Sequence, residues 1–153
     1  MITVYDYTGF KPAGEVERVL TFACNQLGVS DITVVASPNE RILRKLSKYE
    51  VDYQAVLFKN KGVSHIYTLY FRPKLSQAVY TEILCHEAVH LAQQERGDLS
   101  LNLSTGECRW TGEVYPPDYP YMERPWEKEA FKVQSVILKK YRKSVKLSKT
   151  KKS

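Results

Sequence analysis

A His-Glu-x-x-His pattern spans residues 86–90, with His86 and His90 at its ends and Glu87 between them. Residues four apart lie one turn apart on the same face of an α-helix. Two imidazoles placed in this way can bind one metal ion, and zinc is the ion that such pairs usually hold. Glu87 is rotated by about 100° from His86 on a helix, so it need not be a ligand and can face a metal-bound water. The spacing indicates a zinc site with Glu87 as the catalytic acid and base.

The pattern is uncommon by chance, but it does not establish a site alone. At the residue frequencies of this chain, about one random sequence in two hundred of this length would contain it. Buried histidines need hydrogen-bond or metal partners, which favours a metal site over a pair of surface histidines. We expect this helix to be largely buried, because apolar residues surround the histidines: Ile83, Leu84, Ala88, Val89, Leu91 and Ala92.

A catalytic zinc site needs a third protein ligand and keeps its fourth position for water. His65 is the only other histidine, and it belongs to a predicted strand ahead of the helix without further support. Cys85 points about 100° away from His86 on the helix and is expected to be a small buried side chain. Glu127 and Glu129 lie at the start of the next predicted helix, on opposite sides of its apolar stripe. Helix geometry does not choose between these two carboxylates.

The motif, the hairpin predicted after it and the segment 125–130 together resemble small zincins of the gluzincin type. In that group the third ligand is a glutamate on a helix downstream of the two histidines, often in a Glu-x-x-Ala pattern followed by Asp or Asn. Residues 127–130 match the four-residue pattern, so the resemblance implies Glu127 as the third ligand. Phe131 stands at the fifth position, so the acidic or amide group that would orient a ligand histidine is missing there.

The resemblance covers residues 63–138 and extends to ImmA/IrrE-type peptidases and small zincin-like proteins of phages and mobile elements. It implies an α+β, minimal zincin-like fold, in which a small mixed sheet packs on the helix of the motif, with a β-hairpin and a C-terminal helix. Zincin relatives also use an open strand edge to hold an extended peptide. We expect this edge at the strand 63–72.

Hydrophobic periodicity places further elements along the chain. Helices are predicted at 12–28, 39–48, 75–96 and 126–141, and Ser76 and Gly97 cap and end the third of them. Strands are predicted at 31–36, 53–59 and 63–72, the last two joined by residues 60–62. Alternating apolar residues over 99–103 and at 108, 110 and 114 predict a hairpin that turns at Thr105 and Gly106. Residues 116–125 read as a loop rich in Pro and Tyr.

These residues predict zinc-dependent hydrolysis of a protein or peptide. Glu87 would take a proton from a zinc-activated water and pass it to the leaving amine. The developing oxyanion needs a hydrogen-bond donor, and four side chains in or beside the loop offer one without a ranking: Tyr115, Tyr119, Tyr121 and Arg124. The alternative is a zinc-binding regulator or binding module with little turnover, which the departure at Phe131 slightly favours.

The net charge of +6 is unevenly distributed. The last fifteen residues hold eight Lys or Arg and no acid, so residues 1–138 carry a net charge of −2. We predict one domain over residues 1–143 and a basic, disordered tail over 144–153 that offers a weak contact to nucleic acid.

Three widely spaced cysteines do not fit a disulfide framework, and no apolar run is long enough for a membrane span. We therefore expect a cytoplasmic protein without membrane contact.

Overall fold

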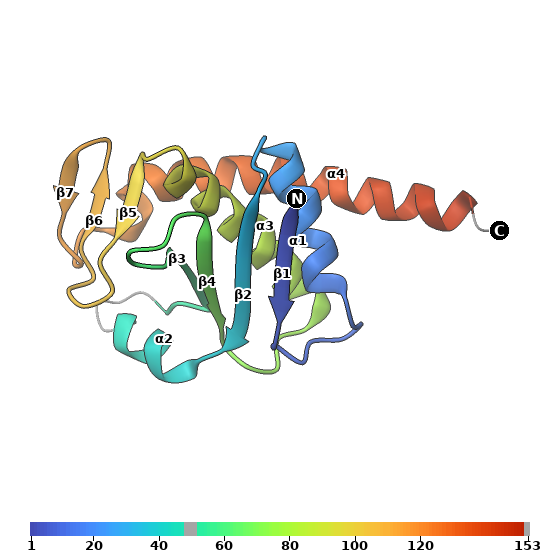
Figure 1. Cartoon of the computed structure of the whole chain (residues 1–153), viewed down its shortest axis with the longest axis horizontal. Helices are drawn as coiled ribbons and strands as arrows, with labels where there is room; N and C mark the ends of the chain where they lie inside the picture. The colour runs from blue at the N-terminus through green and yellow to red at the C-terminus, as the bar shows by residue number, and fades with distance from the viewer. Residues whose placement is uncertain (48–51, 152–153) are drawn as a thin grey trace.

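The centre of the fold is a four-stranded mixed sheet in the order β1-β2-β4-β3 (Figure 1). The computed structural model describes residues 1–47 and 52–151. Strands β1, β2 and β4 run parallel, and β3 pairs antiparallel with β4. Buried and half-buried residues alternate along β2 and β4, as the two-residue period of a strand requires. The strand bounds are Ile2–Asp6 for β1, Ile32–Pro38 for β2, Ala55–Lys59 for β3 and Ile66–Phe71 for β4.

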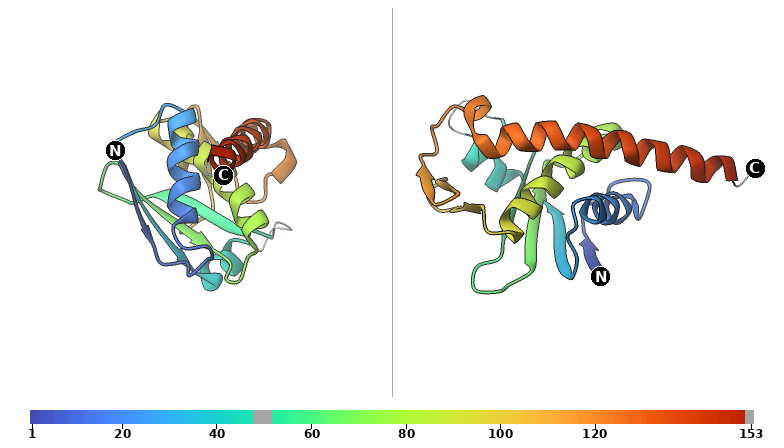
Figure 2. Two further views of the ribbon diagram at one scale, coloured as in Figure 1. Left: turned by 90° about the vertical axis from the view of Figure 1, so that its right-hand side faces the viewer. Right: turned by 90° about the horizontal axis from the view of Figure 1, so that it is seen from above.

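Helices α1 (Glu15–Gln26) and α3 (Gln77–Glu95) cover one face of the sheet, and α4 (Pro125–Lys151) packs against α3 (Figure 2). The short helix α2 (Glu40–Leu46) follows β2 and begins at Asn39, whose side chain accepts a hydrogen bond from the N–H of Ile42. A 3₁₀ turn, η1 (Tyr121–Glu123), leads into α4.

Helix α3 lies inside the fold rather than on its surface. It contacts α1, α4, β3 and the first strand of the second sheet, and every residue from Leu84 to Gln94 is buried. A helix packed on all sides has apolar residues around its whole circumference instead of along one stripe. The polar residues of this stretch are therefore held in the core, where each needs a partner.

A second, three-stranded antiparallel sheet follows α3, in the order β5-β6-β7. Its strands are β5 (Leu99–Leu101), β6 (Cys108–Trp110) and β7 (Glu113–Tyr115). The predicted hairpin is thus extended by a strand, because Thr111 and Gly112, both with positive φ, form a second turn. Val114, predicted on the second strand of the hairpin, lies on β7.

One expectation about the main sheet was wrong. The strand predicted at 63–72 is β4, which hydrogen-bonds to β2 on one side and to β3 on the other, so it has no open edge. The edge strand beside the motif helix is β3. Strand β1 was not predicted, because its residues are half-buried or exposed and give a weak hydrophobic pattern. The coarser expectation of an α+β fold with a mixed sheet is confirmed.

Helix α4 is longer than its apolar stripe predicted. It continues ten residues beyond Tyr141, because no Gly or Pro follows to end it. The segment expected to be a disordered tail is helical as far as Lys151, and Val145 packs against the core. Residue 48 of the predicted helix 39–48 and residues 152–153 of the predicted tail lie outside the described residues.

None of the helices in the described residues combines the length and the apolar character needed to cross a bilayer. Cys24 and Cys85 are buried, Cys108 is half-buried, and all three are free thiols.

We predict that the hydroxyl of Tyr141 stabilises the packing of α4 on α1. It donates a hydrogen bond to the buried carboxylate of Glu15, which also binds Arg18 at 3.0 Å. Replacement Tyr141→Phe leaves that carboxylate with one partner fewer and should lower the free energy of unfolding by about 1–3 kcal/mol in urea titrations. Tyr115→Phe, which removes an exposed hydroxyl 3.5 Å from Glu113, is the matched control and should cost much less. Equal losses in both variants would contradict this account.

Candidate metal centre

Helix α3 presents His86 and His90 on one face, one turn apart. The helix begins at Ser76, whose hydroxyl accepts a hydrogen bond from the N–H of Val79 at 3.4 Å, and its last turn is followed by Gly97 with φ +83°. The four-residue spacing places the two rings edge to face, with 4.7 Å between their centroids. Both histidines are buried.

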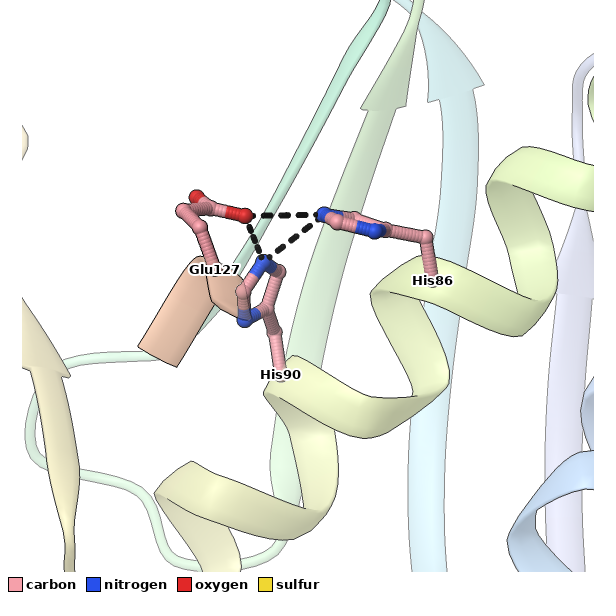
Figure 3. A group of neighbouring side chains, drawn as sticks. All are labelled: His86, His90 and Glu127. Carbon is pink, nitrogen blue, oxygen red and sulfur yellow. Dashed lines mark hydrogen bonds and ion pairs between the residues drawn. The ribbon is translucent and has the colours of Figure 1, made fainter. Parts of the chain in front are cut away.

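Glu127 reaches the two histidines from the first turn of α4, as Figure 3 shows. Its Oε1 atom lies 2.9 Å from Nε2 of His86 and 2.9 Å from Nε2 of His90. The two Nε2 atoms are 3.1 Å apart. Glu127 is 5% exposed, so all three residues of this triangle are largely buried.

The triangle has the dimensions of a metal site. Three ligands at ordinary zinc–nitrogen and zinc–oxygen distances in tetrahedral geometry stand about 3.3 Å apart, close to the observed 2.9–3.1 Å. Among the described residues, this is the one cluster of His, Cys, Asp or Glu side chains found able to hold a metal ion. The buried His-His-Glu group can therefore hold a metal ion.

Two glutamine side chains fix which ring nitrogen faces the centre. Nδ1 of His86 lies against Oε1 of Gln134, and Nδ1 of His90 lies 2.7 Å from Oε1 of Gln93. An amide oxygen only accepts hydrogen bonds, so each Nδ1 must be the donor. In the neutral imidazole, Nε2 then carries the lone pair that a metal requires.

The orientation of Gln93 is itself fixed. Its amide nitrogen donates to the carbonyl oxygen of Trp126 at 3.0 Å and to the carboxylate of Glu129 at 3.1 Å. Gln93 is fully buried, so it has no alternative partners in water. On the other side, the amide nitrogen of Gln134 donates to the carboxylate of Glu82 at 3.4 Å.

The electrostatics of the centre follow from burying a carboxylate beside two imidazoles. Burial alone would lower the pKa of His90, but the Glu127 carboxylate outweighs this effect and raises that pKa to about 9. Burial alone would raise the pKa of Glu127, but the two histidines hold it well below its usual range. The Glu127 carboxylate is thus stabilised by a positive charge beside it. A metal ion that binds here would take the place of the proton on His90.

Glu87 lies beside the triangle without being part of it. Its carboxylate accepts a hydrogen bond from the backbone N–H of Leu57 on β3. Burial raises its pKa, although the two histidines oppose the shift. A carboxylate with a raised pKa is a better proton acceptor near neutral pH.

Of the four candidate oxyanion donors, only Tyr121 reaches the centre. Its hydroxyl donates to Oε1 of Glu127 at 3.1 Å, and burial together with that carboxylate raises its pKa well above the usual range. The hydroxyl therefore stays protonated and remains a donor. The ring packs edge to face against Tyr53.

The guanidinium of Arg124 is held by hydrogen bonds within the loop that precedes α4. Its guanidinium donates to the carbonyl oxygens of Tyr119 and Pro117 at 3.1 and 3.0 Å and to the hydroxyl of Tyr53 at 2.7 Å. Tyr119 supplies a backbone oxygen to this arrangement, while its ring packs against Tyr115. The hydroxyl of Tyr115 lies near Glu113, away from the metal centre.

The structure also places the other ligand candidates. His65 lies at an exposed turn and contacts Glu95. Glu129 points away from the centre and accepts hydrogen bonds from Arg96 at 2.6 Å and from Gln93. Cys85 is fully buried in the core. None of these three belongs to the triangle.

The centre opens into a cleft of about 690 Å³, a size that suits a small ligand or a few peptide residues. One side is formed by residues 52–57 and the other by the second sheet and the loop before α4. Its floor contains both histidines, Glu87 and Glu127. Much of the remaining lining is apolar: Leu57, Val79, Ile83, Leu99, Leu101, Leu103, Met122, Trp126 and Phe131.

Sequence reasoning missed the two glutamines and the backbone contact to Glu87. Gln93 lies three residues after His90, and Gln134 lies seven residues after Glu127, so each glutamine shares a helix face with a residue of the triangle. That spacing was a usable signal. The contact between the backbone of Leu57 and Glu87 had no signal in the sequence, because it depends on how β3 packs on α3.

No family model matches the chain, and neither the curated proteins nor the solved structures that were compared contain a similar one. The case for a function therefore depends on the geometry of the site.

We predict that Gln93 tunes metal affinity through His90. Gln93→Leu keeps the side-chain size but removes the acceptor of the His90 Nδ1 proton, and loss of such a partner typically weakens metal binding by about 10–100-fold. Competition titrations against a zinc chelator measure this change.

Gln94→Leu is the matched control, because Gln94 is also a buried glutamine of α3 but bonds to the backbone of β3 at Leu57 and Lys59. It should change thermal stability while leaving zinc affinity within a few-fold of the original. If both variants weakened zinc binding equally, the orienting role of Gln93 would be refuted.

Proposed function

We propose that this chain is a zinc-dependent peptidase with a minimal zincin-like fold. His86, His90 and Glu127 are its metal ligands, and Glu87 is its general base. The observation that carries the proposal is the buried triangle of Nε2, Nε2 and Oε1 atoms, in which each histidine is held by an amide at Nδ1.

The donor set favours zinc. Two imidazoles and one carboxylate are typical of catalytic zinc sites, which keep the fourth position for water or substrate. Among the described residues, no thiol belongs to the group, so the site differs from the closed, cysteine-rich sites of structural zinc. The neighbouring cleft gives the fourth position access to a substrate.

The chain's own residues fit the chemistry of amide hydrolysis. A zinc ion held here would lower the pKa of a water to about 7 and polarise a carbonyl. Glu87 would accept the proton of the attacking water and pass it to the leaving amine, a role that its raised pKa suits. Tyr121 is the nearest of the four candidate donors to the triangle. Because a hydroxyl carries one proton, it would turn from Glu127 to the developing oxyanion.

The edge of β3 supports an extended peptide as the substrate. Leu57 turns its N–H and carbonyl away from β4, toward Glu87 and Gln94. Gln94 also accepts the N–H of Lys59 at 3.0 Å, so its amide occupies this edge downstream of Leu57. A peptide that added to the sheet would pair upstream, at Ala55, where the edge borders the cleft.

The alternative function, a zinc-binding module with little turnover, was suggested by Phe131. In the structure, the Phe131 ring packs against His86 with 4.8 Å between centroids, and Gln134 and Gln93 take the orienting role that this position lacks. The departure from the family pattern thus does not leave a histidine without a partner. This alternative predicts the same zinc affinity but no loss of function when Glu87 is replaced.

We predict that Glu87→Gln keeps zinc and the fold but abolishes most of the hydrolysis. The amide cannot accept the proton of the water, and general-base catalysis is worth about 10²–10⁴-fold. The assay follows cleavage of a mixed peptide library at neutral pH by the zinc-loaded protein. Glu17→Gln on the exposed face of α1 removes the same charge far from the cleft and should retain full activity.

A chelated sample of the original protein completes the comparison and should be inactive. Cleavage that persisted in Glu87→Gln would rule out the proposed mechanism. A zinc-loaded original protein that cleaved no peptide would instead favour the binding module.

A further inference from the structure

A row of seven cationic side chains runs along α4. All are exposed, and we call them the basic stripe: Lys128, Lys132, Lys139, Arg142, Lys143, Lys146 and Lys149. At 100° per residue their positions fall within an arc of about 120° on the helix circumference, over a length of about 32 Å. The stripe is therefore a linear surface feature rather than a scatter of lysines.

Packing fixes the direction in which the basic stripe faces. The opposite side of α4 carries Trp126, Ala130, Ile137 and Tyr141, all buried against the rest of the protein. The stripe must then point to solvent over its whole length. The C-terminal end of α4 projects past the sheet and the other helices, as Figures 1 and 2 show.

The helix itself carries little acidic charge to balance the basic stripe. After Glu129, α4 contains no Asp or Glu. Between described residues, no ion pair closer than 4 Å involves Lys128, Lys132, Lys139 or Lys143. Without these seven side chains the chain carries a net charge of −1, so the basic stripe is not part of a generally basic surface.

This arrangement is unfavourable for an isolated helix. Lys128 and Lys132, Lys139 and Lys143, and Arg142 and Lys146 are like-charged pairs four residues apart, and each such pair destabilises a helix. A solvated helix surface would gain stability from acidic residues at the intervening positions. A polyanionic partner removes the repulsion.

We propose that the basic stripe binds the phosphate backbone of duplex DNA without reading its sequence. Lysines act as point charges toward phosphates, and such contacts give affinity but not base recognition. The binding surface goes beyond the proposed peptidase function and does not depend on zinc.

Other polyanions fit the stripe less well. A membrane-surface helix needs a free apolar face, but the apolar face of α4 is packed against the protein. Among the described residues of α4, three separate large apolar side chains are exposed: Phe131, Val136 and Leu147. Single strands are bound by stacking on aromatic rings. The one aromatic at the border, Phe131, packs against His86 and Tyr121 instead.

The position of the basic stripe gives it a functional consequence. It begins at Lys128, directly after the ligand Glu127. A duplex lying along α4 would pass beside the metal centre and hold the cleft close to proteins that share the same DNA.

The test measures binding of the zinc-loaded full chain to a fluorescent 20-base-pair duplex by anisotropy, over a series of salt concentrations. The expected affinity falls steeply with salt, with a slope of log K against log salt of magnitude about 3 or more, because each neutralised phosphate contributes about 0.9. Two duplexes of unrelated sequence should bind equally.

A triple variant tests the surface itself. Lys132→Gln, Lys139→Gln and Lys143→Gln together should weaken binding at least tenfold and reduce the salt slope by about 0.9 for each phosphate that is no longer neutralised. Glutamine preserves helix propensity, and thermal unfolding checks the fold. The matched control removes three exposed charges elsewhere: Arg41→Gln, Lys61→Gln and Arg109→Gln.

A second variant, which ends the chain at Val145, removes only the projecting part of α4 and should lower the salt slope in part. Equal weakening by the two triple variants would overturn the proposal, because net charge rather than the stripe would then explain binding. Absence of binding at 50 mM salt would also overturn it. So would tighter binding of single-stranded DNA, of anionic phospholipid vesicles or of poly-glutamate than of the duplex.

Discussion

The structure brings three hydrogen-bond acceptors into contact in the protein interior, and the rest of the site depends on this arrangement. The Nε2 atoms of His86 and His90 and the Oε1 atom of Glu127 lie within 3.1 Å of one another. Lone pairs at such distances repel strongly in a low-dielectric interior unless a cation lies among them. In the metal-free chain that cation is a proton on His90, whose pKa is raised to about 9. A divalent metal satisfies all three acceptors at once.

The surrounding fold keeps the three acceptors in place. Helix α3 is buried around its whole circumference, so its polar residues must find partners inside the protein, and no buried side-chain nitrogen or oxygen of the described residues lacks one. Gln93 joins α3 to α4 by bonding to His90 on its own helix and to Trp126 and Glu129 on α4. Helices α3 and α4 together carry the three residues of the triangle and the two amides that orient the histidines. Their close packing resists the small displacements that weaken metal sites.

How much of this could be predicted depended on how local each feature is. The spacing of His86 and His90 and the place of Glu127 in the first turn of α4 are local features, and the motif with its family resemblance pointed to all three residues of the triangle. Spacing marked Gln93 and Gln134 as candidates, but which imidazole each amide contacts depends on how α3 and α4 pack together. The contact from Leu57 to Glu87 depends on the packing of β3 on α3 and had no signal in the spacing. β1 was missed because its burial comes from pairing with β2 rather than from its own pattern. The extent of α4 was underestimated because charge was taken as a sign of disorder, although nothing in the sequence ends the helix.

X-ray absorption spectroscopy at the zinc edge of the zinc-loaded chain tests the central claim most directly, because it reports the ligands of the metal without a substrate. The predicted spectrum fits one zinc per chain with four nitrogen or oxygen atoms at about 2.0–2.1 Å, and outer-shell scattering from two imidazoles. A sulfur shell at about 2.3 Å, scattering from one imidazole or none, or failure of the chain to retain stoichiometric zinc would contradict the account.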